Sequence, residues 1–147
     1  MGLGRIAGWF KAKPSSSHEI EAELYNAFGN AIVEQAGSVA VSVLAYVELS
    51  DDAISSSLRY SYKDSLHIEQ GFLGNEGAQI LMKLQEHLSR QGDQNVWTAM
   101  EYFVDYGEVN TTLSYDPIDE DEPFWDRSAA IIAKYFPGKE IVRKSLN

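Results

Sequence analysis

The chain contains no cysteine, so disulfide bonds and thiolate metal sites are excluded. It also lacks any apolar run near the roughly 18 residues that a transmembrane helix needs, and it has no secretory hydrophobic region. We therefore expect a cytoplasmic protein.

The 147 residues of the chain suit one domain. A domain of this length buries about 68 to 70% of the surface of its unfolded chain, which is enough for a single core.

Residues suited to catalysis or metal binding are also scarce. The three histidines, His18, His67 and His87, show neither the His-x-x-x-His spacing nor the acidic pairing that is typical of a metal site. The serine-rich stretches at 15–17 and 55–57 carry no Gly-x-Ser-x-Gly motif and suit a linker and a turn. We therefore expect no catalytic residue, no cofactor and no metal ion, and we interpret the chain as a binding protein.

Basic side chains are rare in the middle of the chain. The formal net charge is −10, and residues 18–133 hold 21 acidic side chains against five basic ones. Proteins that bind nucleic acids or anionic membranes neutralise phosphates with lysine and arginine, so this balance argues against both kinds of partner. An acidic surface suits a basic protein partner, which it attracts by electrostatic steering. The alternative is that the charge serves solubility alone.

Residues 1–17 differ from the rest of the chain and are interpreted as a basic amphipathic arm with a serine-rich linker. Apolar residues at helical spacing stand beside three basic residues, and a proline followed by three serines ends the pattern. These residues are Leu3, Ile6, Trp9 and Phe10, then Arg5, Lys11 and Lys13, and Pro14. Two or three turns with three glycines would contact a membrane only weakly and would not insert stably. Docking of the arm on the fold and an unstructured arm are the alternatives.

The remaining residues, 18–147, are expected to form a single α+β domain. Apolar residues recur at helical spacing in three stretches, which are 17–36, 75–91 and 123–136. They alternate as in strands in five stretches, which are 38–49, 58–62, 66–72, 96–106 and 109–115. Strands joined by short turns pair antiparallel, and the valine-rich face of the first strand needs cover. The sequence therefore predicts the order α-β-β-β-α-β-β-α, with a single antiparallel sheet of about five strands and helices packed on one face.

The segment from Asp116 to Asp126 concentrates negative charge between the last expected strand and the last expected helix. Its sequence is Asp-Pro-Ile-Asp-Glu-Asp-Glu-Pro-Phe-Trp-Asp. It does not fit a calcium loop, because Pro123 and Phe124 replace the expected glycine and no glutamate follows at the twelfth position. Consecutive carboxylates before a helix are usually solvated, so an ordinary surface loop is one interpretation.

Aromatic residues border this charge, and aromatic anchors ringed by polar groups are typical of interface hot spots. We therefore predict a partner-binding surface. The predicted contacts are Asp116, Asp119, Glu120, Asp121, Glu122 and Asp126, with Trp125 as the apolar anchor and with Asp51 and Asp52 as a second acidic patch if their turn lies at the same end of the sheet. Phe124 and Trp125 can each belong to the core instead.

The aromatic-rich sheet is a second candidate surface. Its rings are Tyr46, Tyr60, Tyr62, Trp97, Tyr102 and Tyr106. Cross-strand pairing and helix packing account for rings at such positions. An uncovered sheet face would instead present them to a peptide or a small ligand, and the chain would then be a non-catalytic regulatory or adaptor domain.

Short motifs in the last hairpin and the last helix resemble those of the YezG-like immunity proteins of bacterial polymorphic toxin systems. They are Trp97-Thr98, Tyr115-Asp116, Asp126-Arg127 and Lys134-Tyr135-Phe136-Pro137-Gly138, and the order of elements from His18 onward is similar as well. The resemblance implies a small cytoplasmic protein without catalysis that binds a cognate toxin domain, often a nuclease, and blocks it. The acidic residues inserted between these motifs, from Asp119 to Glu122, and the basic arm are peculiar to this sequence, so the identity of the toxin does not carry over.

The charge of the chain provides a mechanism for such inhibition. A nuclease attracts phosphates with lysine and arginine, so an acidic surface can occupy its active site as a substrate mimic or cover its nucleic-acid groove. We therefore expect an immunity protein whose partner is a basic, nuclease-like toxin domain. The adaptor domain with an aromatic binding surface is the alternative.

Overall fold

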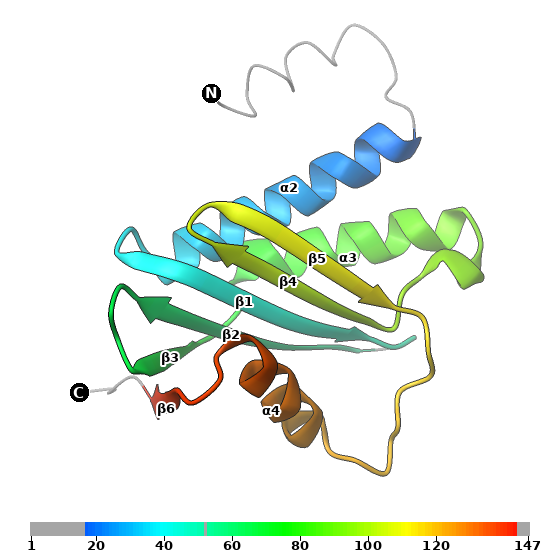
Figure 1. Ribbon diagram of the computed structural model, residues 1–147. Coiled ribbons are helices and arrows are strands. Elements are labelled where there is room, and N and C mark those ends of the chain that lie inside the picture. Colours follow the sequence, from blue (N-terminus) through cyan, green and yellow to red (C-terminus); the bar gives the residue numbers. More distant parts are fainter. Residues whose placement is uncertain (1–16, 52, 144–147) are drawn as a thin grey trace, which may run out of the picture.

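A six-stranded sheet forms the centre of the molecule, and helices lie on both of its faces (Figure 1). The computed structural model describes residues 17–51 and 53–143. The elements are α2 Ser17–Ala36, β1 Ala40–Leu49, β2 Ile54–Tyr62, β3 His67–Gly71, α3 Asn75–Arg90, the 3₁₀ helix η1 Asp93–Asn95, β4 Ala99–Asp105, β5 Glu108–Ser114, α4 Phe124–Tyr135 and β6 Glu140–Arg143. The strand order across the sheet is β5-β4-β1-β2-β3-β6.

The predicted α+β fold class and the order α-β-β-β-α-β-β-α are confirmed, and strands β1 to β5 pair antiparallel. The sequence did not predict β6, which pairs parallel with β3 and places Glu140 opposite His67. A strand of four residues is too short to show a hydrophobic period. The predicted arm of residues 1–17 lies outside the described residues except for Ser17, at which α2 begins.

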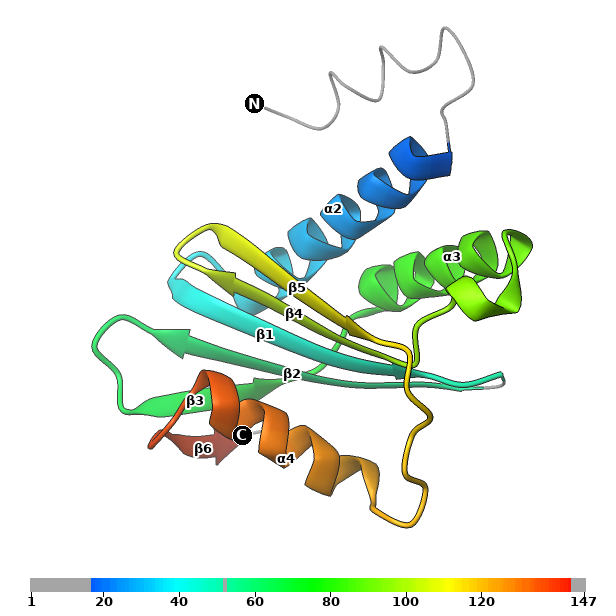
Figure 2. The ribbon, with the colours of Figure 1, turned by 45° about the vertical axis from the view of Figure 1, so that its right-hand side comes forward.

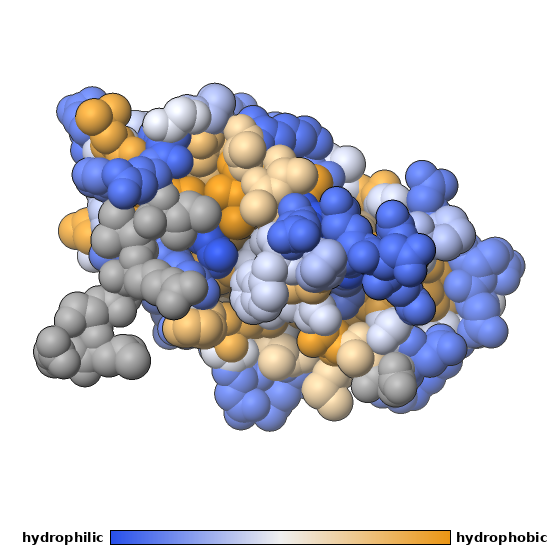
Figure 3. Space-filling model, turned by 90° about the horizontal axis from the view of Figure 1, so that it is seen from below, coloured by the Kyte–Doolittle hydropathy of each residue, from blue (hydrophilic) through white to orange (hydrophobic). Residues whose placement is uncertain are grey.

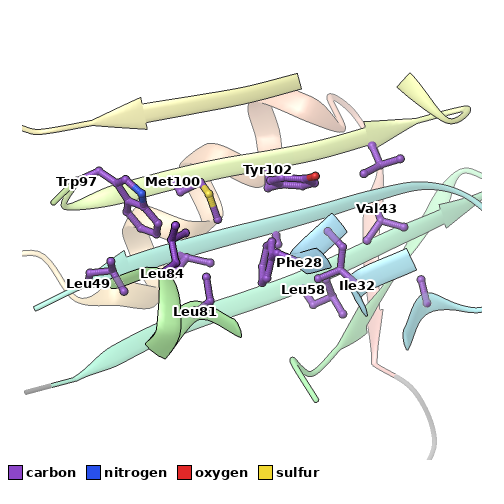
Figure 4. Close-up of a cluster of buried hydrophobic side chains, with 14 of the residues drawn as sticks. Phe28, Ile32, Val43, Leu49, Leu58, Leu81, Leu84, Trp97, Met100 and Tyr102 are labelled. Atoms are coloured by element: carbon purple, nitrogen blue, oxygen red, sulfur yellow. The ribbon is translucent and has the colours of Figure 1, made fainter. Parts of the chain in front are cut away.

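The main core lies between the sheet and the helices α2 and α3 (Figure 4). Alternate residues of β1, such as Val43 and Val47, point to this side, where they meet Phe28 of α2 and Leu84 of α3. Phe28 packs edge-on against Tyr102 of β4, with 5.4 Å between the ring centroids. The strand period of two and the helical period of 3.6 each provide one apolar face, and the two kinds of face cover each other.

Helix α4 packs on the opposite face of the sheet, so the prediction that the helices share one face is wrong (Figure 2). Ile132 and Phe136 of α4 form a second, smaller core with Leu44 of β1 and Ile68 of β3. As a result β1 is buried on both faces from Ser42 to Leu49.

This second buried face of β1 could not be predicted from the sequence, because it contains both polar and apolar residues. Ser42, Leu44, Tyr46 and Glu48 alternate with the valines of β1 and resemble a solvent-facing side. Polar groups can be buried when each has a partner, and here Glu48 pairs with Arg127 of α4. None of the described helices is long and apolar enough to cross a membrane.

Candidate partner-binding site

The acidic segment, residues 116–126, connects the end of β5 to α4 at one end of the sheet (Figure 2). Its exposed acidic residues are Asp116, Asp119, Glu120, Asp121, Glu122 and Asp126. Figure 3 shows the face on which α4 lies, and the part of this face to the right of the centre, where the acidic segment lies, is largely hydrophilic. The structure thus places all six predicted acidic contacts on one exposed stretch of chain.

Thr98, which immediately precedes β4, holds the start of the acidic segment. Its Oγ1 donates to the carbonyl oxygen of Asp116 at 2.6 Å and lies 3.0 Å from the carbonyl oxygen of Ser114. Its backbone N–H donates to the same Ser114 oxygen at 2.8 Å. The segment therefore leaves the sheet at a defined position.

The guanidinium of Arg127 holds the other end of the acidic segment. Nη1 donates to the carbonyl oxygens of Asp119, at 2.7 Å, and of Glu122. Nε and Nη2 donate to the two carboxylate oxygens of Glu48, at 2.7 and 2.6 Å. The N–H of Glu122 also donates to the Asp119 carbonyl oxygen at 3.2 Å and closes a turn. Because the donors of a guanidinium form a rigid fork, this one side chain fixes the acidic turn relative to β1 and α4.

The ion pair of Arg127 and Glu48 is largely removed from solvent, with 16% and 8% of the two side chains exposed. The hydroxyl of Tyr46 donates to Glu48 at 2.6 Å. Burial acts to raise the pKa of Glu48, but the hydrogen bonds from Arg127 and Tyr46 outweigh it, and the pKa lies below its ordinary value. Burial and the neighbouring carboxylate raise the pKa of Tyr46, and the bond to Glu48 raises the pKa of Arg127. The pair therefore stays charged at neutral pH.

Replacing Glu48 with glutamine should lower the free energy of unfolding at pH 7 by about 3 kcal/mol, because Arg127 would lose its partner. This difference from the wild type should shrink at low pH. A carboxyl whose pKa is lowered by folding stabilises the native state above its ordinary pKa of 4.5, and the contribution disappears as the pH falls through the folded value. Urea unfolding of the wild type and of the glutamine variant, from pH 7 down to about pH 3, measures the difference in stability at each pH. A difference that stays constant over this range would contradict the role assigned to the ion pair.

The two aromatic residues at the start of α4 have different environments. Phe124 is half-buried and stacks on Tyr46, with 5.8 Å between the ring centroids and 20° between the ring planes. Trp125 is 57% exposed and packs edge-on against Phe124, with 5.1 Å between the ring centroids. Phe124 therefore contributes to packing, whereas the indole of Trp125 lies open beside the carboxylates, where an interface anchor is expected.

The turn after β1 lies at the same end of the sheet as the acidic segment. The N–H of Leu49 donates to the carbonyl oxygen of Thr98 at 2.9 Å, and Thr98 is the residue that holds Asp116. Asp51 follows Leu49 by two residues and is exposed. Asp51 therefore satisfies the condition set for the second acidic patch, and Asp52 lies outside the described residues.

Most of the rings in the aromatic-rich sheet belong to the core. Tyr46, Tyr60, Trp97 and Tyr102 are buried, Tyr62 is half-buried and Tyr106 is exposed. Because helices cover both faces of the sheet, packing accounts for the buried rings. They form no open aromatic surface.

Sequence reasoning did not identify Glu48, Thr98 and Arg127 as residues of the site. Arg127 carries a signal that could have been used. It lies near the start of α4, where the helix dipole disfavours a cation, so its position implies an anion nearby. Which acid supplies that charge could not be deduced, because Glu48 is 79 residues away in the chain.

The arrangement provides exposed carboxylates on a fixed turn and one open indole, which suits recognition of a basic surface. Among the residues that the structure describes, no group of three or more histidine, aspartate and glutamate side chains could hold a metal ion.

No protein-family model matches the chain, and no curated protein matches it either.

Proposed function

We propose that the chain is an immunity protein that binds and neutralises a cognate bacterial toxin domain in the cytoplasm. The toxin domain is basic and nuclease-like, and it contacts the acidic segment, with Trp125 as the apolar anchor. The observation that carries the proposal is that the exposed carboxylates stand on a turn whose backbone Arg127 and Thr98 tie to the sheet.

Fixed geometry distinguishes a binding surface from a charge that serves solubility. Solubility requires only scattered charges, and these need no ordered backbone. Binding is stronger when the surface is already ordered, because less conformational entropy is lost on association. A rigid array of carboxylates can take the place of phosphates in a nuclease or cover its nucleic-acid groove.

The resemblance to YezG-like immunity proteins supports the same proposal. Thr98, Asp116 and Arg127 belong to the motifs that carry the resemblance, and in this chain they hold or begin the acidic segment. The acids from Asp119 to Glu122 are not part of that pattern. This division fits a common scaffold that presents a contact surface specific for one toxin.

The proposal predicts that the gene immediately upstream encodes the cognate toxin domain, and that domain provides the test. Co-expression of the chain should protect cells from that domain, and titration calorimetry should show tight binding that weakens steeply with ionic strength. A toxin domain from an unrelated system is the control and should not bind. A chain that neither binds the upstream domain nor protects cells from it would refute the proposal.

The adaptor domain remains the alternative, and it predicts ligand binding that salt hardly changes. Four of the six rings that it would use are buried. For this reason we favour the immunity function.

A further inference from the structure

In the part of the chain that the structure describes, the outer edge of β5 is a free sheet edge, and the acidic segment follows at the end of this strand. β5 is the last strand on its side of the sheet, and no other described strand pairs with its outer edge. Residues Glu108–Thr112 are all exposed. The strand contains no proline and a single charged residue, although charge and proline are what usually protect an edge from pairing. This edge is therefore open to another strand.

The position of this edge is well defined. A two-residue turn at Tyr106 and Gly107 joins β4 to β5, and their φ angles are 48° and 84°. Positive φ angles at both central residues are typical of the hairpin turns that match the twist of the paired strands. The far end of β5 is held by the bond between Ser114 and Thr98. A partner would thus meet a preformed edge.

The main-chain groups of Val109, Thr111 and Leu113 point to the free side. The carbonyl oxygen of Ser114 accepts the N–H of Thr98, so the main chain of Ser114 faces β4. Successive residues of a strand turn their N–H and C=O groups to opposite sides. A peptide could therefore bond to these three residues without disturbing the ladder between β5 and β4.

An apolar groove adjoins the same edge. It has a volume of about 480 Å³ and lies between α2 and the hairpin end of β4 and β5, where Val33, Val41 and Val109 line it. The side chains at 109, 111 and 113 face this side of the sheet, because their partners in β4 belong to the main core. Alternate side chains of an added strand would point the same way, so those next to Val109 would enter the groove.

Charge decides which strand suits this edge. The exposed acids Asp105 and Glu108 lie at its hairpin end, and Asp116 lies just beyond its other end. A second copy that paired antiparallel would bring acids against acids at both ends, and each copy carries a net charge of −10. A strand flanked by lysine or arginine would be attracted instead.

We propose that the free edge of β5 pairs with an extended strand of the toxin domain and continues the contact that begins at the acidic segment. The strand has apolar residues at alternate positions and basic residues at its ends. Main-chain hydrogen bonds along β5 provide affinity, and the groove selects the alternate side chains. This inference rests on the proposed function, because the toxin domain is the partner in both.

The variant Thr111→Pro tests the inference against the matched variant Thr111→Ala. Both remove the threonine side chain, but only proline removes the N–H that faces the free edge, where proline is tolerated. Titration calorimetry with the upstream toxin domain should give about a tenfold loss of affinity for T111P. T111A should bind within about twofold of the wild type. Thermal unfolding of the free variants reports whether each one folds.

Amide hydrogen exchange of the wild type, followed by NMR, gives an independent result if T111P does not fold. Adding the toxin domain should slow the exchange of the amides of Val109, Thr111 and Leu113, which face the free edge. The amides of Asn110 and Thr112 face β4 and should already be protected without the toxin domain.

The outcomes separate this inference from the proposed function. Wild-type binding with unchanged exchange at Val109, Thr111 and Leu113, or with full affinity of a folded T111P, would overturn the inference and leave the proposed function standing. A wild type that does not bind the toxin domain would overturn both. A dimer of the chain alone that T111P converts to a monomer would assign the edge to a second copy and would also overturn the inference.

Discussion

Replacing Arg127 with alanine should lower the free energy of unfolding by about 3 to 5 kcal/mol, which is the usual cost of breaking a buried ion pair from one side. The substitution leaves Glu48 as a carboxylate that is 8% exposed and has lost its cation. It also removes the donor to the carbonyl oxygens of Asp119 and Glu122. A domain is stable by only about 5 to 15 kcal/mol. The expected loss is therefore a large fraction of the total free energy of unfolding. Urea unfolding measures the change.

Arg90→Ala is the matched control for this prediction. Arg90 also pairs with a glutamate, Glu86, but 72% and 63% of these two side chains are exposed. Exposed pairs stabilise a protein by about 0 to 1 kcal/mol, so R90A should have little effect. Equal losses in R127A and R90A would show that the contact with Glu48 has no special weight.

The double variant Glu48→Leu with Arg127→Met separates stability from the positioning of the acidic segment. It leaves neither charge unpaired, and apolar replacements of a buried ion pair are often close to neutral, so much of the stability should return. Affinity for the proposed toxin domain should nevertheless be lower than that of the wild type, because methionine cannot hold the carbonyl oxygens of Asp119 and Glu122. If the double variant binds as tightly as the wild type, Arg127 does not position the acidic segment for binding.

Changing Asp119, Glu120, Asp121 and Glu122 to serine should weaken toxin binding about 100-fold at low salt. This corresponds to about 2.7 kcal/mol for the four exposed charges together. Much of the loss should appear in the association rate, because exposed charges steer the encounter. The stability of the free protein should change by about 0.5 kcal/mol or less, since all four side chains are exposed. Stopped-flow association and calorimetry at low and high salt measure these effects.

A second quadruple variant controls for net charge. Its four substituted acids are exposed and belong to α2, α3 and η1, which lie on the other side of the sheet from α4. They are Glu34, Glu76, Glu86 and Asp93, each changed to serine. Both variants change the net charge equally, so only the position of the charges differs. If the two variants lose the same affinity, the overall charge of the chain drives binding and the acidic segment has no specific role.

The order of elements could be read from the sequence because each element carries its own period. The valines of β1 and the apolar stripe of α3 are local patterns, and both predicted elements were found within a few residues of their expected bounds. The exposure of the acidic segment was predictable for a similar reason, since consecutive carboxylates are too costly to bury together. The turn residues Tyr106 and Gly107, between two alternating stretches, likewise predicted the hairpin of β4 and β5.

What the sequence by itself determined is therefore local: the helices and strands, the antiparallel pairing of neighbours, and the position of the acidic segment between β5 and α4. The tertiary structure alone decided which face α4 covers, which acid pairs with Arg127, and which of Phe124 and Trp125 stays exposed. Each of these depends on groups far apart in the chain. Whether a buried charge is stable depends on the partner that the fold brings to it, so the pair that holds the acidic segment became visible only when β1 and α4 were placed together.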